Sequence, residues 1–549
     1  DGFILHGKIK LPNGECTLRD AFSFKDNAWR VTRRWSYNGT TQDNTTLSIR
    51  FQQPGFGANL LLPGIFYYGN PSGIKSGCVP QIDRQPGSKG FYEETRFPVP
   101  FAMAEQDDGR TATLHTIPSL APAPKRHDLW WSLGAEYLQD CTELAAYSGY
   151  VHGNKGDGMV KATQPGWLLL DNACIALHDN AIVDKSFAIQ TQLVTKKGTG
   201  FLQPMDTAIK RWKPTTVPID PHELVRKKYR YAMARYYKKG DVYGSLFHPT
   251  GVKPEAIVYG WCGRNETFGY AAPILGKDCG DQDWELRARE SYDFLCNSPI
   301  DQNGFCVRYD IETKAWTDRN FVSQGQTLET FTAALLLKIQ NKQPIPQKWL
   351  DFLKNATDAL ANRILKDDWK PVSTNEAFLG APLANAARIL KNDKLKQAAI
   401  KLADNYMERH LSMQEPYWGG TLDARCEDKE GAVAAMTAFH AVWEMTGDDK
   451  YLKAAEHATQ VFLTYLQLWD IPMPPGRLAD NHFLSRGWTA VSVQNMHLDV
   501  YGVFVTPLLW KLGKALNRKD WQQLAIPMFA NCGQLLDPYG SQGEQIQQT

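Results

Sequence analysis

The sequence lacks the features of a membrane-spanning protein, a zinc module or a nucleic-acid-binding protein. No run approaches the roughly 20 apolar residues that a membrane helix needs. The ten cysteines are scattered, without a C-x-x-C pair or zinc-ligand spacing. Neither sign of charge dominates, because 61 Lys and Arg stand against 59 Asp and Glu. We therefore expect no metal, no cofactor, no nucleic-acid partner and no membrane span.

The start of the chain carries no charged segment followed by an apolar stretch. The chain therefore reads as soluble and, if exported, already processed, and we expect a periplasmic or secreted protein. Most cysteines should be buried thiols in so large a core, and Cys296 with Cys306 is the first pair to examine for a disulfide. The sequence leaves a homo-oligomer open.

Length and aromatic content indicate a large globular protein. The 549 residues are enough for two to four domains or two large ones. The 17 Trp, 22 Tyr and 24 Phe could line a large cleft or fill many packing contacts. This abundance suits sugar binding but does not prove it.

Residues 1–212 read as an antiparallel β-sandwich. Short β-rich runs alternate with Gly, Pro and Asn turns, and no long helical period interrupts them. The runs are 46–51, 59–68, 111–117, 166–178 and 186–195. Three prolines within residues 211–221 then indicate a stiff linker.

Residues 213–549 read as helical, because the apolar period changes from two to about 3.6. Amphipathic segments alternate with segments that are apolar on every side, as expected for an outer ring around buried inner helices. The amphipathic segments are 220–237, 281–296, 347–365, 394–411, 449–468 and 518–534, and the apolar ones are 268–276, 326–341, 376–391, 428–446 and 499–516. Repeated turn sequences at 391–399, 447–455 and 517–525 support hairpin repetition. A six-hairpin (α/α)6 barrel would lack only its last inner helix.

The hairpin turns, together with loops 416–430 and 477–482, resemble the six-hairpin glycosidase superfamily of glycoside hydrolases and polysaccharide lyases. The resemblance covers nearly the whole chain as architecture: an α+β multidomain protein with a β-sandwich before an (α/α)6 toroid. Among its branches, the chain looks most like bacterial exo-acting enzymes that remove uronic acids, such as β-glucuronidases. The resemblance implies a site built from the loops that enter the inner helices.

Four carboxyls in these loops are candidate catalytic groups, because glycoside hydrolysis uses two. Glu427 and Asp428 adjoin the start of the apolar segment 428–446, where either could be an acid or base or only a helix cap. Asp480 lies in a polar loop and is the first candidate for the second carboxyl. The alternative is a purely structural role in an Asx-turn. Glu266, beside Arg264, is either catalytic or half of an ion pair.

Basic and aromatic residues of the same loops are candidate substrate-binding groups. Guanidinium groups pair with carboxylates in a bidentate manner, as a uronic acid would require. Aromatic side chains such as Trp418 could stack on a pyranose ring. The candidate residues are Arg264, Arg425, Trp418, His482, Arg486, His497 and Tyr501.

His497 and Tyr501 also support a lyase reading. Placed one helical turn apart on one face, they could abstract the C5 proton of a uronate, although a hydrogen-bonded core pair is the alternative. We expect His440 to be such a core residue. The leading hypothesis is an exo-glycosidase acting on an acidic oligo- or polysaccharide. The alternatives are a polysaccharide lyase, a sugar epimerase or isomerase, and a non-catalytic carbohydrate-binding scaffold.

Overall fold

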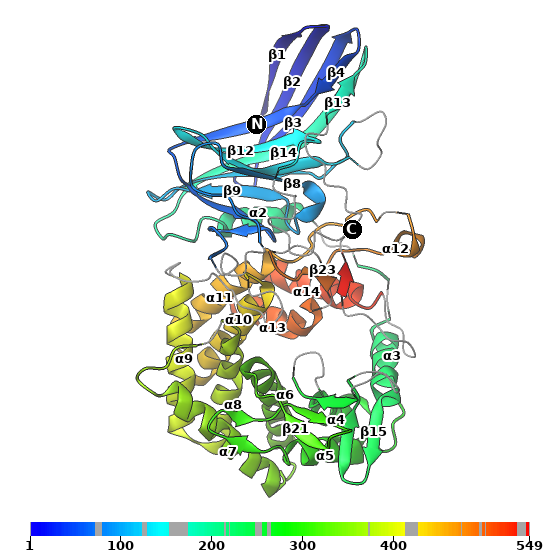
Figure 1. Ribbon diagram of the computed structural model, residues 1–549, viewed down its shortest axis with the longest axis vertical. Helices are drawn as coiled ribbons and strands as arrows, with labels where there is room; N and C mark the ends of the chain where they lie inside the picture. The colour runs from blue at the N-terminus through cyan, green and yellow to red at the C-terminus, as the bar shows by residue number, and fades with distance from the viewer. Residues whose placement is uncertain are drawn as a thin grey trace.

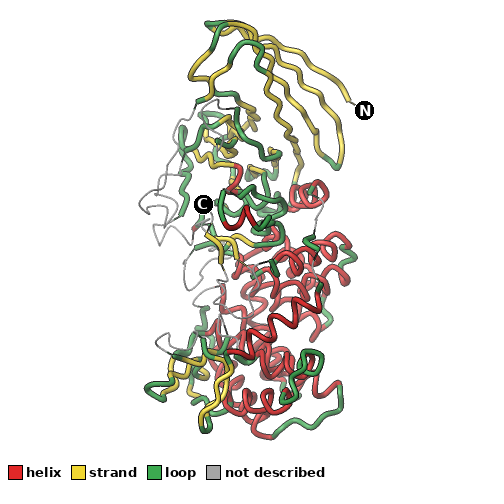
Figure 2. The backbone as a smooth tube through the Cα atoms, turned by 90° about the vertical axis from the view of Figure 1, so that its right-hand side faces the viewer, coloured by secondary structure: helices red, strands yellow, loops and turns green. Residues whose placement is uncertain are grey.

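The computed structural model divides into a strand-rich N-terminal part and a helical remainder (Figures 1 and 2). It describes residues 2–71, 79–122, 129–152, 174–212, 216–218, 220–247, 255–260, 265–371, 374–411, 426–473, 475–493, 497–499, 501–534 and 545–547.

Two antiparallel sheets form the N-terminal part, as the sequence predicts. The larger has the order β1-β2-β3-β14-β10-β9-β6-β7 and the smaller has the order β5-β12-β11-β8. Their strands are β1 Gly2–Leu11, β2 Gly14–Lys25, β3 Ala28–Gly39, β14 Ile182–Leu193, β10 Arg110–Thr116, β9 Phe101–Glu105, β6 Asn59–Leu62, β7 Phe66–Tyr67, β5 Ser48–Pro54, β12 Cys141–Ser148, β11 Trp131–Tyr137 and β8 Lys89–Glu93.

An apolar core joins the two sheets. Inward-facing side chains such as Trp35 from the large sheet and Trp131 from the small one meet with ring centroids 5.7 Å apart. One ion pair is also buried there, since Lys185 lies 2.7 Å from Glu94 with both side chains 0% exposed. A buried pair of this kind is tolerated only because each charge compensates the other.

All eleven predicted helices are present. The amphipathic ones are α3 Pro221–Ala234, α5 Trp284–Leu295, α7 Gln347–Ile364, α9 Asp393–Leu411, α11 Asp449–Leu463 and α14 Lys519–Asn531. The apolar ones are α4 Thr267–Leu275, α6 Phe321–Gln340, α8 Gly380–Leu390, α10 Lys429–Thr446 and α13 Gly502–Ala515. The segment predicted as one helix over 376–391 is divided into a 3-10 turn, η2 Thr374–Leu379, and α8.

The apolar helices contact one another in the order α4, α6, α8, α10, α13. The amphipathic α5, α7, α9 and α11 contact one another in the same way outside them. This is the inner and outer arrangement that the periodicity predicts, while closure into a six-hairpin barrel stays a prediction. Within the described residues no inner helix follows α14 to complete the sixth hairpin, and none of the helices is long and apolar enough to cross a membrane.

Residues 202–211 correct the all-β interpretation of the N-terminal region, because they form helix α2 Leu202–Arg211. Its buried residues include Met205 and Ile209, four positions apart and therefore on one face. The prediction missed this short period because a run of β-rich segments precedes it. The domain boundary at residues 212–213 stays a prediction.

The sandwich and the helices share a tightly bonded interface. Tyr67 stacks on Tyr465 with centroids 5.0 Å apart, and its hydroxyl lies 2.6 Å from the Thr464 hydroxyl. Trp469 donates its indole N–H to the Phe97 carbonyl at 2.9 Å. These contacts fix the end of α11 against the sandwich.

Small elements complete the described chain. They are β4 Gln42–Thr45, β13 Ile175–Leu177, η1 Glu94–Arg96, β15 Tyr236–Lys239, β16 Val242–Ser245, β17 Ala256–Val258, β18 Ile300–Asp301, β19 Gly304–Phe305, β20 Arg308–Asp310, β21 Ala315–Thr317, α12 Arg477–Asp480, β22 Thr489–Ala490, β23 His497–Asp499 and β24 Gln545–Gln547.

The cysteine pair singled out in the sequence forms no disulfide. Cys296 and Cys306 are both free, and burial raises the pKa of each thiol. His440 is a core residue as predicted, since it is 6% exposed and burial lowers its pKa.

Candidate active site

The N-terminal ends of three inner helices, α6, α10 and α13, meet around Tyr501. Its hydroxyl accepts a hydrogen bond from Gln326, in the second turn of α6, at 2.8 Å. The Lys429 ammonium, at the start of α10, lies 4.8 Å from the centre of the Tyr501 ring. Tyr501 itself is half-buried and directly precedes α13. Gln326 and Tyr501 are 175 residues apart in the chain and are therefore brought together by the fold.

Five ionisable residues are buried at this convergence. Four are consecutive, at the start of α10, and the fifth lies in β23. Glu427, Asp428 and Lys429 are 0% exposed, and Glu430 and Asp499 are 4% exposed. Charged groups are rarely buried without partners, so the partners of each residue decide which of them stay ionised.

Asp428 is the N-cap of α10. Its carboxylate accepts the Gly431 backbone N–H at 2.8 Å, and its backbone is extended. The cap explains why α10 begins where it does, because a carboxylate satisfies a free N–H and favours the positive end of the helix dipole. Glu427, one residue earlier, is fixed through its backbone carbonyl, which accepts the Val493 N–H at 3.0 Å.

Lys429 forms an ion pair with Asp499. The ammonium nitrogen lies 2.7 Å from one carboxylate oxygen of Asp499. The other oxygen accepts the Thr489 hydroxyl at 2.5 Å and the Tyr501 backbone N–H at 3.2 Å. Burial opposes the charge of Lys429, but Asp499 and Glu430 outweigh it and raise its pKa. Lys429 is therefore ionised at neutral pH.

Glu430 has the opposite character. One carboxyl oxygen lies 3.5 Å from the Lys429 ammonium, and the other is buried with no hydrogen-bond partner among the described residues. Burial raises the pKa of Glu430 to about 8. The charges of Asp428 and Asp499 contribute to this rise, and the Lys429 ammonium opposes it. This carboxyl is therefore protonated at neutral pH, and such a group is a proton donor.

Glu266 lies near the end of α6 that Tyr501 also contacts. It is 0% exposed and precedes α4, and its carboxylate accepts the Gly260 backbone N–H at 2.9 Å. Gly260 has φ +62°, and a Cβ there would lie 2.2 Å from the Ser323 carbonyl in the first turn of α6. Ser323 and Gln326 are one turn apart on α6, so Glu266 and Tyr501 flank the same end of that helix.

Glu376 is a further buried carboxyl ahead of an inner helix. It is 1% exposed, lies in η2 and is 2.6 Å from the Arg363 guanidinium. Arg363 also lies 4.2 Å from the centre of the Phe321 ring. These contacts tie α7, η2 and the start of α6 together, and the cation beside Glu376 lies closer than the 3.5 Å between Glu430 and Lys429.

The loop that carries Asp480 is not part of this cluster. Asp480 and His482 are exposed, and α12, which contains Asp480, stands at the outer edge of the molecule (Figure 1). Arg486 forms an ion pair with Asp470 at 2.5 Å. The structure thus brings together Glu427, Asp428 and Tyr501, and places Asp480, His482 and Arg486 elsewhere.

The prediction that His497 and Tyr501 share a helical face is wrong. Residues 497–499 form strand β23, which pairs with β22 and β24, and α13 begins only at Gly502. Strand pairing of these residues overrides their helical period. The side chain of His497 and all of Arg264, Arg425 and Trp418 lie outside the described residues.

Sequence reasoning missed Lys429, Glu430 and Asp499. A signal for two of them was present, because the apolar segment that begins at 428 is buried on every side and therefore buries its first charged residues too. Asp499 has no such signal, since its partner Lys429 lies 70 residues earlier in the chain.

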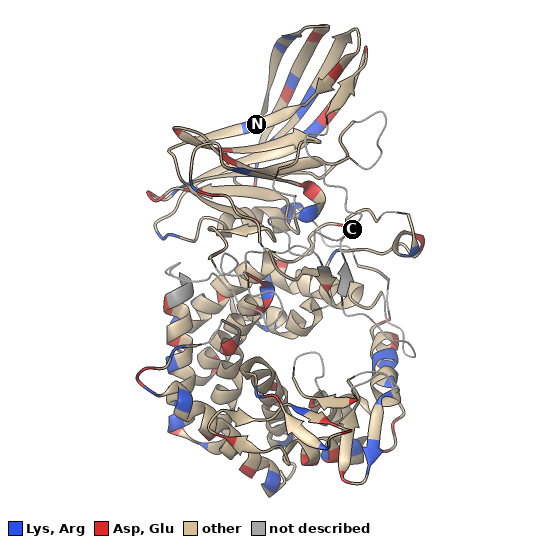
Figure 3. Ribbon diagram, viewed as in Figure 1, with Lys and Arg blue, Asp and Glu red and all other residues tan. Residues whose placement is uncertain are grey.

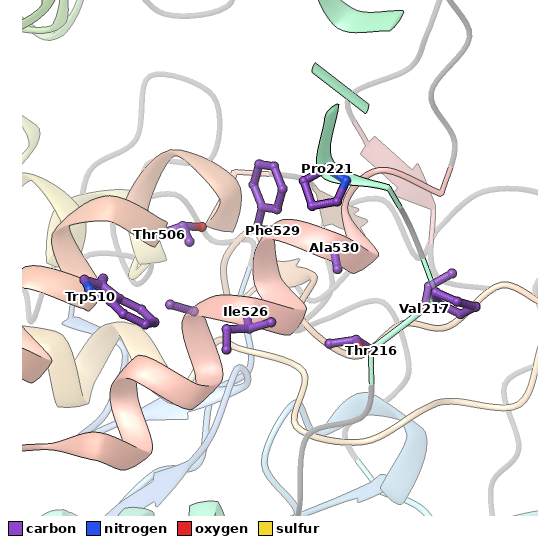
Figure 4. A pocket seen from close by; sticks show the side chains of 10 residues that line it. Thr216, Val217, Pro221, Thr506, Trp510, Ile526, Phe529 and Ala530 are labelled. Carbon is purple, nitrogen blue, oxygen red and sulfur yellow. The ribbon is translucent and has the colours of Figure 1, made fainter. Parts of the chain in front are cut away.

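A pocket of about 380 Å³ lies away from these carboxyls. Figure 4 shows its apolar lining, in which Trp510 of α13 and Ile526 and Phe529 of α14 face Thr216 and Val217. Acidic and basic side chains are interspersed over the molecule (Figure 3). Within the described ranges, no group of three or more His, Cys, Asp or Glu side chains could hold a metal ion.

No family model matches the sequence. No curated protein matches it either. Among solved structures, the chain is similar to a polysaccharide lyase at 7% identity and TM-score 0.44, over 98% of this chain and 83% of that one. It is similar to a D-mannose isomerase at 12% identity and TM-score 0.40, over 56% and 84%. It is also similar to a heparin-specific unsaturated glucuronyl hydrolase at 15% identity and TM-score 0.37, over 57% and 83%.

Proposed function

We propose that the protein is a glycosidase that hydrolyses a uronic-acid-containing oligo- or polysaccharide, with Glu430 as the general acid. The observation that carries the proposal is the state of Glu430, a buried carboxyl with one unpartnered oxygen and a pKa raised to about 8. Glycoside hydrolysis needs such a carboxylic acid to protonate the leaving oxygen at neutral pH.

The second carboxyl in this proposal is Glu266. A backbone N–H donates to it, which favours negative charge on that oxygen. It would serve as the nucleophile or as the base that activates water. Asp428 is less suited to either role, because its carboxylate already caps α10. Glu427 is the reserve candidate on the α10 side.

The proposed acidic substrate follows from the sequence. Arg425 stands two residues before Glu427 in the sequence, and Arg264 stands two residues before Glu266. A guanidinium at each carboxyl would bind a uronate.

A lyase is the second candidate, and one observation favours it. The Tyr501 hydroxyl accepts a hydrogen bond from Gln326, and the Lys429 cation lies against the Tyr501 ring. Both contacts stabilise a phenolate, the form in which a tyrosine can remove a proton. Elimination would leave a C=C bond in the product and consume no water.

A panel of uronic-acid-bearing oligosaccharides, incubated with the protein, separates these reactions. Products are followed by mass spectrometry and by absorbance of new double bonds. The proposal predicts a saturated uronic acid with one water added per bond, whereas an unsaturated product of unchanged total mass would refute hydrolysis and favour Tyr501. Asp480→Asn is the matched control, because that carboxyl is exposed and outside the cluster.

A further inference from the structure

The Lys429–Asp499 ion pair affects the protonation of Glu430, because both carboxyls lie near the same ammonium. The Lys429 ammonium has two carboxyls within reach, and it lies 2.7 Å from Asp499 but 3.5 Å from Glu430. The three side chains are buried, so no water screens the choice between them. Whichever carboxyl holds the ammonium is stabilised as the anion.

Asp499 is fixed beside the Lys429 ammonium by the surrounding structure. It lies in β23, the middle strand of the sheet β22-β23-β24, so its backbone is paired on both sides. Its second oxygen is fixed by the Thr489 hydroxyl and the Tyr501 N–H. Thr489 is itself in β22 and 0% exposed. The carboxylate therefore cannot turn away from Lys429 without breaking these two hydrogen bonds.

Each of the other titratable groups near the start of α10 has contacts of its own. Asp428, on the same helix, is held by the Gly431 N–H. Tyr501, from the start of α13, presents its ring to Lys429. Tyr465, beyond the end of α11, is a fully buried phenol. Burial is the main cause of its raised pKa, and Asp428 and Glu427 raise that pKa further. Asp428 adds negative charge beside Glu430, and negative charge disfavours ionisation of Glu430.

We infer that Asp499 and Lys429 are a positioning pair for the proposed acid: Asp499 holds the ammonium away from Glu430, so that Glu430 keeps its proton. The inference rests on the proposed function, which it deepens. It assigns neither residue a contact with the substrate. Lys429 and Asp499 cancel each other's charge, and Glu430, which lies farther from the ammonium, stays neutral.

The test is Asp499→Asn, which frees the ammonium to pair with Glu430. The inference predicts that the alkaline limb of the kcat/KM profile moves at least one pH unit toward acid. Thr489→Val keeps every charge and loosens Asp499, so it should move the limb in the same direction by less. The double variant Lys429→Gln with Asp499→Asn removes both partners and should return the limb to the wild-type position or above it.

A readout without substrate separates this inference from the proposed function. Carboxyl carbons labelled with ¹³C are titrated by NMR, and the Glu430 signal is assigned by its loss in Glu430→Gln. If Asp499→Asn lowers the titration midpoint of Glu430 while Glu430→Gln stays fully active, the pair is supported and the catalytic role is not. If the midpoint is the same in wild type, Asp499→Asn and Thr489→Val, the inference is overturned whatever the activity.

Discussion

Replacing Glu430 by Gln should make the protein more stable at neutral pH while it removes the proposed acid. The raised pKa means that the folded state binds the Glu430 proton more tightly than the unfolded chain does. Between the ordinary value of 4.5 and about 8, the unfolded chain loses this proton and the folded protein keeps it. The stability that this group contributes is therefore lost as pH rises through that window.

The size of the effect follows from the two pKa values. One pKa unit corresponds to about 1.4 kcal/mol, so wild type should lose about 3 kcal/mol between pH 5 and pH 7.5 through this group, and Glu430→Gln none. Urea unfolding of both proteins at the two pH values measures the difference. Other titrating groups are common to both proteins and largely cancel. Equal pH dependence of the two unfolding free energies would refute the reasoning about Glu430.

Three further predictions concern stability. Lys185→Met leaves Glu94 buried without its cation and should cost about 3–5 kcal/mol in urea unfolding; Arg34→Met, at an ion pair whose side chains are 50% and 44% exposed, is the control and should cost far less. Asp428→Ala removes the cap of α10 and should cost about 1–2 kcal/mol, and an unchanged midpoint would contradict the capping role. Tyr67→Phe deletes a 2.6 Å hydrogen bond between sandwich and helices and should cost about 1 kcal/mol, with a wild-type melting temperature as the contrary result.

The long outer helices were predictable because each repeats its pattern over several turns. Residues 347–365 and 394–411 alternate apolar and polar positions over several turns, and α7 and α9 begin and end within one residue of those bounds. Helix α2 was missed because its ten residues directly follow β-rich runs and were grouped with them. Residues 497–499 carry no local mark of a strand, because their pairing partners lie elsewhere in the chain.

The sequence indicates where buried carboxyls gather, but it does not indicate which of them holds a proton. The loop before the apolar segment 428–446 is where buried carboxyls occur, and sequence reasoning placed Glu427 and Asp428 there. It could not assign the proton to Glu430, because that depends on which carboxyl Lys429 contacts in three dimensions. Asp480 looked equally promising in a polar loop, since burial, not local composition, separates it from the cluster.

The role of Glu430 in bond cleavage is tested most directly by the turnover of Glu430→Gln on the oligosaccharide that wild type cleaves. An amide cannot donate the proton, so kcat should fall by about 100-fold or more, while Asp480→Asn stays close to wild type. The wild-type rate should decline as pH rises through about 8, where Glu430 ionises. A Glu430→Gln protein that cleaves the substrate at the wild-type rate would contradict the account.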